Sequence, residues 1–402
     1  MSLWRETEFG KLLTAAVVAA GGFHVSVMAM QLTAALVLDA SAIEMGILVA
    51  AEFVPGLVIA LPAGVGVDRM RRRPVMIAAD AGRAVLLAVV PIAWVGGWLS
   101  MSLLYLVALG VGLLTTLFDV AAPAYLPSLV GRARLLQANG ALQAGSAAVT
   151  VIGPNVAGVL VQALTAPLTL GVAGIGYVAS AVSLMTIRHP EPAATKAHSP
   201  PMRAAIGEAL RYLLDHPVLR TLSLTSAAYS FFQAMRAAVF VLFMTRVLEL
   251  EPVTLGFVWG AGGAGALLGA LVAARLAARV GTGRALIAAY LLGPFAALAP
   301  AAVLVPEAVV PIVLVGQLGM GFWGPVYGVN ASTLTQSLVD ERLIGRVVAA
   351  NRFMYRAPEP LGALVGGVVG SIVGAGSTLL LAAVGISLGA FLVYRSPVRD
   401  VR

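Results

Sequence analysis

Three charged residues that lie close together in the sequence, Arg352, Arg356 and Glu359, could form a proton-exchange site in which the glutamate carries the proton. They follow one another at intervals of four and three residues, so a helix would place all three on one face. Pro358 and Pro360 flank the glutamate, and a proline inside a helix removes a hydrogen bond and bends or breaks the chain. A carboxyl group at such a break, beside arginines, can bind and release a proton. The alternative is a fixed ion pair between Arg356 and Glu359.

Other acidic residues lie in stretches that are otherwise apolar. Glu52 and Asp119 are alternative sites for proton exchange, and Asp119 is expected first to pair with arginines of a nearby basic loop. Glu52 and Arg236 lie at comparable depth in their stretches. They could form an ion pair, or each could extend separately to the membrane surface. Asp80 and Arg83, three residues apart, are expected to pair with each other in a structural role.

The sequence argues against most other chemistry. It has no cysteine, and its four histidines lack the spacing of a metal site. Residues 260–265 match the glycine spacing of a dinucleotide fingerprint, but they lie inside an apolar stretch with no strand before them, so they indicate helix packing. There is no phosphate-binding loop with a lysine, and no acids, histidines and serines converge on one site. We therefore expect no metal, no organic cofactor and no enzyme activity.

The elements that position these residues are predicted to be membrane-spanning helices. Of 402 residues, 60% are hydrophobic and 11% are charged, and the mean hydropathy is +0.95. Soluble proteins carry about 25% charged residues. Apolar runs long enough to cross a bilayer, which takes about 20 residues, occur near residues 11–37, 45–67, 74–97, 101–122, 136–162, 165–187, 218–246, 253–275, 284–305, 310–336, 347–374 and 376–394. The sequence thus predicts an all-α membrane protein with twelve transmembrane helices.

The runs fall into two sets of six. We expect a six-helix bundle at 1–187, a polar linker at 188–217 and a second six-helix bundle at 218–402. The linker begins with a proline-rich stretch and continues as an amphipathic helix, which either lies on a membrane face or is an ordinary solvated helix. Two pseudo-symmetric six-helix repeats are typical of secondary transporters.

Charge distribution predicts the orientation. Nearly all arginines and lysines lie in loops on one side, whereas the other side has only Arg246. Because cytoplasmic loops are rich in these residues, both termini and the linker are expected to be cytoplasmic. We expect a multi-pass protein of a bacterial inner membrane.

One of the basic loops contains a distinctive pattern. Its residues are Gly64, Asp68, Arg69, Arg72 and Arg73. This pattern resembles the signature loop of the major facilitator superfamily, although Gly66 and Arg71 depart from it. An acid and several guanidinium groups at a membrane face can form an ion-pair network that exists in only one conformation. The general excess of basic residues in cytoplasmic loops would account for the arginines of this loop, but not for Asp68.

Further segments resemble particular branches of this superfamily. The residues Gly145, Gly153, Pro154 and Gly158 are similar to the glycine-rich signature of its antiporters. Segments 207–220 and 345–348, the latter containing Arg346, resemble the branch that includes the enterobactin exporter, the macrolide-efflux proteins and a mycobacterial tetracycline/aminoglycoside efflux pump. The run 101–122 lacks the mid-helix arginine of many proton antiporters.

The resemblance also implies a central cavity. The residues it points to are His24, Gln31, Phe231, Phe232, Gln233, Arg236, Trp323, Tyr327 and Asn330. Aromatic rings mixed with a few hydrogen-bonding groups suit planar or amphipathic organic compounds. Such a stripe is also ordinary helix packing, and His24 could be a hydrogen-bonded packing residue.

The sequence therefore predicts a monomeric secondary transporter that exports a small amphipathic drug or siderophore-like compound by proton antiport and alternating access. Its partners would be this substrate and the lipid bilayer, with no nucleic acid, and the proton gradient would supply the energy. Glu359 would carry the proton, and Arg346, Arg352 and Arg356 would join the signature loop in gating. The alternatives are a nutrient importer or uniporter, and a non-transporting membrane sensor or lipid-moving protein.

Overall fold

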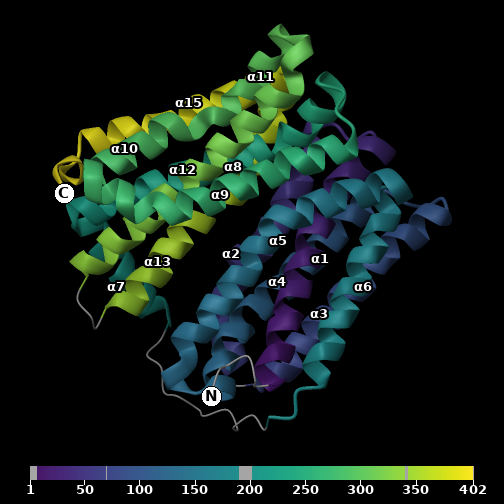
Figure 1. Cartoon of the computed structure of the whole chain (residues 1–402), viewed down its shortest axis with the longest axis horizontal. Coiled ribbons are helices and arrows are strands. Elements are labelled where there is room, and N and C mark those ends of the chain that lie inside the picture. The colour runs from purple at the N-terminus through teal and green to yellow at the C-terminus, as the bar shows by residue number, and fades with distance from the viewer. Residues whose placement is uncertain (1–6, 69, 190–201, 340–342, 402) are drawn as a thin grey trace. The chain divides into compact units, whose positions relative to one another are not determined.

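The computed structural model describes residues 7–68, 70–189, 202–339 and 343–401, and all the regular secondary structure in these ranges is helical (Figure 1). The helices of the first half are α1 (Thr7–Leu32), α2 (Ala42–Asp68), α3 (Arg72–Val95), α4 (Met101–Val130), α5 (Leu135–Leu164) and α6 (Ala166–Met185). They are followed by α7 (Met202–Asp215), α8 (Pro217–Leu242), α9 (Pro252–Val280), α10 (Thr282–Leu292), α11 (Leu298–Ala301), α12 (Val309–Leu338), α13 (Ile344–Arg356), α14 (Glu359–Val373) and α15 (Ala375–Tyr394).

Ten helical segments in the described part of the chain are long and apolar enough to cross a membrane. Each coincides with one of the twelve predicted runs. Of the remaining two runs, 45–67 lies within the single long helix α2. The run 347–374 is divided between α13 and α14, because the prolines at 358 and 360 cannot donate hydrogen bonds to carbonyl groups four residues earlier. The count of twelve spans and the cytoplasmic termini stay predictions.

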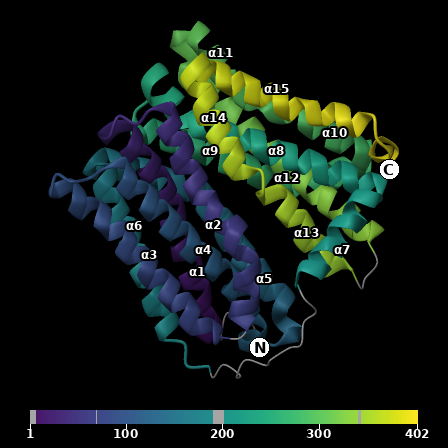
Figure 2. The ribbon, with the colours of Figure 1, turned by 180° about the vertical axis from the view of Figure 1, so that it is seen from behind.

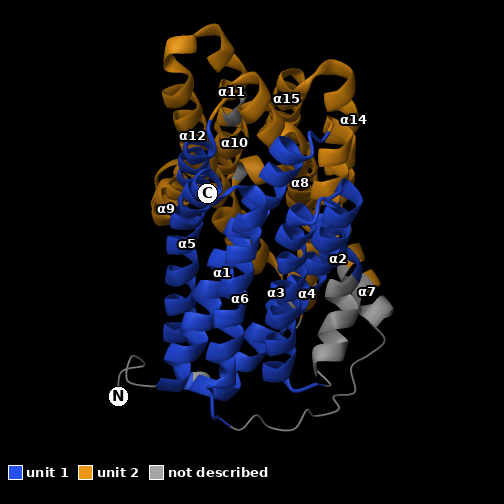
Figure 3. Ribbon diagram, turned by 90° about the vertical axis from the view of Figure 1, so that its right-hand side faces the viewer, with its two compact units in different colours: residues 1–40, 51–197, 251–260 blue, residues 41–50, 198–250, 261–402 orange. Residues whose placement is uncertain are grey.

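The chain forms two compact units (Figure 3). Unit 1 contains residues 1–40, 51–197 and 251–260, and unit 2 contains residues 41–50, 198–250 and 261–402. The main division falls within the predicted linker, but the two short segments 41–50 and 251–260 belong to the unit of the opposite half. The limits of the predicted six-helix bundles stay predictions.

Close glycine contacts explain the placement of the two short segments. In unit 2, a Cβ atom at Gly46 would lie 2.8 Å from the Ala363 carbonyl oxygen and 2.9 Å from Cα of Gly367 in α14. In unit 1, a Cβ atom at Gly256 would lie 2.6 Å from the Pro154 carbonyl oxygen in α5. Only glycine permits backbones to approach this closely.

The two units share one packing scheme. In unit 1, α1 packs against α5 and α6, and α3 packs against α6 and α4. In unit 2, α8 packs against α14 and α15, and α10 packs against α15 and α12. The helices α1, α3, α4, α5 and α6 therefore correspond to α8, α10, α12, α14 and α15.

Local backbone geometry repeats in the same order. Both α1 and α8 continue into five-residue π-helical segments, Thr33–Val37 and Phe243–Val247. After these segments Asp39 and Glu249 have positive φ angles of 49° and 52°. Two chain segments with little sequence identity thus make the same turn at equivalent places.

The linker helix α7 packs against unit 2. Leu213 is 1% exposed and lies in a cluster with Leu219, Val347 and Ala350. Arg346 of α13 pairs with Glu208 of α7 at 3.0 Å. At least part of the apolar face of α7 therefore covers protein, and whether the helix also lies on a membrane face stays a prediction.

Candidate functional site

The predicted proton-exchange group lies at the break between α13 and α14. Glu359 is the first residue of α14, and its carboxylate accepts a hydrogen bond from Nη1 of Arg356 at 3.3 Å. The Glu359 side chain is 9% exposed, whereas that of Arg356 is 48% exposed. The carboxyl group of Glu359 is therefore buried beside a guanidinium group that is partly exposed on the protein surface. Arg352, one turn earlier, is exposed.

Glycines bring Glu359 close to α8. Gly362 and Gly366 in α14 lie against the backbone of α8 at Phe231 and Met235. Tyr355 is near enough to Glu359, Tyr229 and Tyr327 for electrostatic interaction with all three. The acid and the aromatic residues of α8 and α12 are thus neighbours within one unit.

A hydrogen-bonded stripe follows one face of α8. Nε of Arg236 donates to Oε1 of Gln233 at 3.1 Å, and Nε2 of Gln233 donates to the hydroxyl group of Tyr229 at 3.2 Å. Arg236 also lies over the ring of Phe240, 4.8 Å from its centre. Its Nη1 atom is buried and has no hydrogen-bond partner within the described residues. This stripe leaves one cationic donor available.

Tyrosine rings adjoin the stripe. The hydroxyl groups of Tyr327 and Ser226 are 2.6 Å apart, and Tyr327 donates to the Leu222 carbonyl oxygen at 3.2 Å. The rings of Tyr229 and Tyr327 are stacked with centres 6.3 Å apart, and Tyr290 meets Tyr327 edge-on at 4.9 Å. Tyr290 and Tyr327 are buried in the hydrophobic core of unit 2, and the half-buried Tyr229 packs against them.

The structure gathers only part of the predicted cavity set. Gln233, Arg236 and Tyr327 lie in the cluster just described. Phe232 and Trp323 border the hydrophobic core of unit 2. The side-chain amide of Asn330 donates to the Val326 carbonyl oxygen in its own helix at 2.7 Å.

Sequence reasoning missed Ser226, Tyr229, Tyr290 and Tyr355. Ser226, Tyr229 and Tyr355 could have been found. Ser226, Tyr229, Gln233 and Arg236 follow at intervals of three, four and three residues, which is one polar face of a helix. Tyr355 lies between Arg352 and Glu359, whereas nothing in the sequence points to Tyr290.

The predicted residues of unit 1 form separate groups. The carboxyl group of Glu52 lies beside the side chain of Gln31, and its Oε1 atom is buried without a hydrogen-bond partner within the described residues. His24 meets the ring of Phe23 edge-on at 5.7 Å and packs against Gly153 of α5. Asp119 is exposed on α4.

The glycine-rich segment of α5 packs in two directions. Gly145 and Gly153 face Val17 and His24 of α1, whereas Gly158 faces the backbone at Pro252 and Gly256 in the first turn and a half of α9. The helix continues through Pro154 to Leu164.

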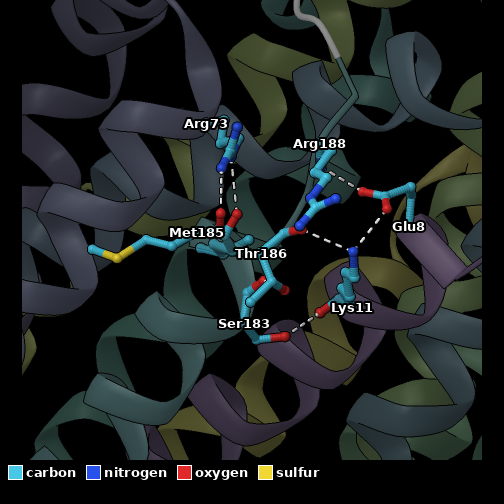
Figure 4. Close-up of polar contacts among 8 residues, drawn as sticks. Glu8, Lys11, Arg73, Ser183, Met185, Thr186 and Arg188 are labelled. Atoms are coloured by element: carbon cyan, nitrogen blue, oxygen red, sulfur yellow. Dashed lines mark hydrogen bonds and ion pairs between the residues drawn. The ribbon is translucent and has the colours of Figure 1, made fainter.

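Part of the signature loop can be placed. Nε and Nη2 of Arg73 donate to the carbonyl oxygens of Leu184 and Met185 at 2.9 and 2.6 Å, and so join α3 to the end of α6 (Figure 4). Arg72 is the first residue of α3. Gly64 and Asp68 lie in α2. The side chain of Asp68 and the whole of Arg69 lie outside the described residues. The gating role of the loop stays a prediction.

Asp80 and Arg83 of α3 form an ion pair, as predicted. Asp80 also accepts a hydrogen bond from Ser180 of α6 at 2.6 Å, and Arg83 lies over the rings of Phe118 and Tyr177 at 4.8 and 4.3 Å from their centres. This group holds α3, α4 and α6 together.

Comparison with known proteins places these features in a family. Residues 12–358 match the family described as the Major Facilitator Superfamily. The chain is 30% identical over 379 residues to the multidrug efflux pump Tap of Mycolicibacterium fortuitum, covering 90% of each chain. It is 26% identical over 252 residues to the enterobactin exporter EntS of Salmonella typhi, covering 62% of this chain and 58% of that protein.

A solved structure agrees in fold. A bacterial homologue of the iron transporter ferroportin, in an inward-facing state, superposes with a TM-score of 0.78 at 14% identity, covering 98% of this chain and 99% of that one. The all-helical architecture, the apolar helices and the family match over most of the chain lead to one conclusion: this protein is a multi-pass membrane protein that belongs to the major facilitator superfamily.

Proposed function

We propose that this protein is a proton-coupled exporter of a small amphipathic organic compound in a bacterial inner membrane. The observation that carries the proposal is Glu359, a buried carboxyl group at a helix break that is hydrogen-bonded to the half-exposed Arg356. The names of the relatives, a multidrug efflux pump and an enterobactin exporter, favour export over uptake.

The pair of Arg356 and Glu359 suits proton exchange because its two members differ in burial. An ionised carboxylate in an apolar environment needs a paired cation, whereas a protonated carboxyl group does not. Proton binding to Glu359 would therefore release Arg356, which is exposed enough to move. The prolines around the acid leave the helix free to adjust at this point.

The neighbouring cluster suits an organic substrate. Tyr229 offers a half-buried ring that packs on the buried rings of Tyr290 and Tyr327, and Arg236 offers a buried donor with no partner in the described residues. A planar compound with a carbonyl, phenolate or carboxylate oxygen would satisfy both. Tyr355 lies between this cluster and Glu359, so substrate and proton would be sensed by adjoining groups.

The test uses purified protein in acid-loaded liposomes that contain a pH-sensitive dye. Lipophilic cations, macrolides, tetracyclines and siderophores are added in turn, and substrate-evoked proton efflux from the liposomes is followed. We expect the Glu359→Gln variant to lose this proton movement while still binding the substrate, as measured by tryptophan fluorescence. Glu307→Gln, which changes an exposed acid, is the matched control. Proton movement at the rate of the unaltered protein in Glu359→Gln would overturn the assignment.

A further inference from the structure

One end of unit 1 contains a basic pocket that the transport proposal does not use. It has a volume of about 510 Å³ and is lined by Arg71, Arg73, Arg188, His189, Pro74, Ile77 and Ala78. The three arginines give it a cationic wall, and Pro74, Ile77 and Ala78, all on α3, give it an apolar floor. The pocket lies where α3 begins and α6 ends, on the side predicted to be cytoplasmic.

The cationic wall is built from one fixed and two exposed guanidinium groups. Arg73 is held by the terminal carbonyl groups of α6 (Figure 4). Arg71 and Arg188 are exposed, and Arg188 also interacts electrostatically with Glu8. The nearby acid, Glu8, accepts hydrogen bonds from Nζ of Lys11 and the backbone N–H group of Arg188, both at 2.7 Å. The pocket therefore keeps an excess of positive charge.

The apolar floor continues along both helices. From Pro74 and Ala78, exposed apolar residues recur on α3 at helical spacing, at Ala81, Val85 and Ile92. On α6 the exposed residues Met185, Val182, Val178 and Ile175 also follow helical spacing. The two helices pack against each other and run side by side (Figure 2). Hydrocarbon can thus extend from the pocket towards the middle of the membrane.

We propose that this pocket binds the phosphate headgroup of an anionic phospholipid, with its acyl chains along α3 and α6. Basic pockets between transmembrane helices on the cytoplasmic side suit anionic headgroups, and each arginine near the surface contributes about 1 kcal/mol. A free phosphate ion would use the cationic wall but not the apolar floor. A zwitterionic lipid would leave the excess positive charge of the wall unbalanced.

The experiment measures lipid binding by native mass spectrometry of the detergent-purified full chain. Dioleoyl phosphatidylglycerol and dioleoyl phosphatidylcholine are titrated separately. We expect saturable binding of phosphatidylglycerol that is at least tenfold tighter than that of phosphatidylcholine. Loss of two arginine contacts in Arg71→Gln/Arg188→Gln should weaken phosphatidylglycerol binding about thirtyfold. The Arg71→Lys/Arg188→Lys variant should retain most of the binding.

Controls separate the pocket from general surface charge and from folding. Arg275→Gln/Arg279→Gln removes two arginines near the end of α9, on the same predicted side of the membrane. This variant should bind phosphatidylglycerol in preference to phosphatidylcholine as strongly as the unaltered protein does. Thermal midpoints should agree among all variants, since Arg71 and Arg188 are exposed. Unchanged phosphatidylglycerol binding in the double glutamine variant, or an equal affinity for both lipids, would overturn the proposal. Displacement of the lipid by inorganic phosphate at equal concentration would show an anion site instead, and would also overturn it.

Discussion

At the scale of single residues, buried charge decides where this protein is vulnerable. The side chains of Asp80 and Arg83 are 0% and 3% exposed. Asp80 is also held by Ser180, and the guanidinium group of Arg83 lies over two aromatic rings. Removing one member of a buried pair leaves the other charge without compensation, whereas replacing both members with apolar residues of similar volume is often tolerated.

We predict that Asp80→Ala lowers the free energy of unfolding by about 3–5 kcal/mol. The double variant Asp80→Leu/Arg83→Met should recover much of this loss, because it buries no unpaired charge. Thermal midpoints in detergent measure both effects, and Glu307→Ala, at an exposed acid, is the control. If the double variant were no more stable than Asp80→Ala, then the contacts of Asp80 with Ser180 and of Arg83 with the aromatic rings would contribute to stability beyond the neutralisation of the two charges.

The same residues show what a sequence can predict about a site. Asp80 with Arg83, and Arg356 with Glu359, are correct pairs because both members lie on one helix, where spacing alone determines contact. Ser180 comes from another helix, and its contact with Asp80 depends on how α3 and α6 pack. Sequence spacing holds no information on that packing, so Ser180 and Tyr290 were missed.

At the scale of elements, the two repeats make the same turn with different residues. Thr165, between α5 and α6, has φ 102° and ψ 157°. Gly374, between α14 and α15, has φ 84° and ψ 160°. This region of backbone space is essentially restricted to glycine. Unit 1 therefore holds a threonine in a conformation for which unit 2 uses glycine.

We predict that Thr165→Gly raises the free energy of unfolding by about 1–2 kcal/mol. The change removes backbone strain of about 1–3 kcal/mol. Part of this gain is offset because glycine increases the conformational entropy of the unfolded chain. The reciprocal change, Gly374→Thr, should lower it by a similar amount. Thermal midpoints of the two variants should move in opposite directions. If Thr165→Gly were less stable, contacts of the threonine side chain would outweigh the strain.

Helix limits were predicted well where their causes are local. The prolines at 358 and 360 signalled a break in the run 347–374, and the chain divides there into α13 and α14. The packing of α7 on α13 was not predicted, since its amphipathic pattern is the same for a helix that covers protein and one that covers lipid. An apolar stripe shows that a helix covers something, but not what it covers.

At the scale of the whole molecule, apolar runs predicted the membrane-spanning segments because the bilayer sets one length for all of them. Ten of the twelve runs match long apolar helices in the described residues, and the packing scheme of unit 1 recurs in unit 2. The shared scheme rests on backbone contacts at glycines and on turn geometry rather than on residue identity.

The orientation of the molecule yields the last prediction. Since the chain has no cysteine, a single introduced thiol is unique and can be labelled without removing others. Ala278 is exposed near the end of α9, and Glu307 is exposed before α12. The excess of arginine in the loop near Ala278 predicts that this loop is cytoplasmic, and one further span would then place Glu307 outside. A membrane-impermeant maleimide should therefore label Glu307→Cys in intact cells and Ala278→Cys only in inverted vesicles. Labelling of both thiols in intact cells would mean that the segment between them, Thr282–Leu304, does not cross the membrane, and the predicted 6+6 arrangement would then fail.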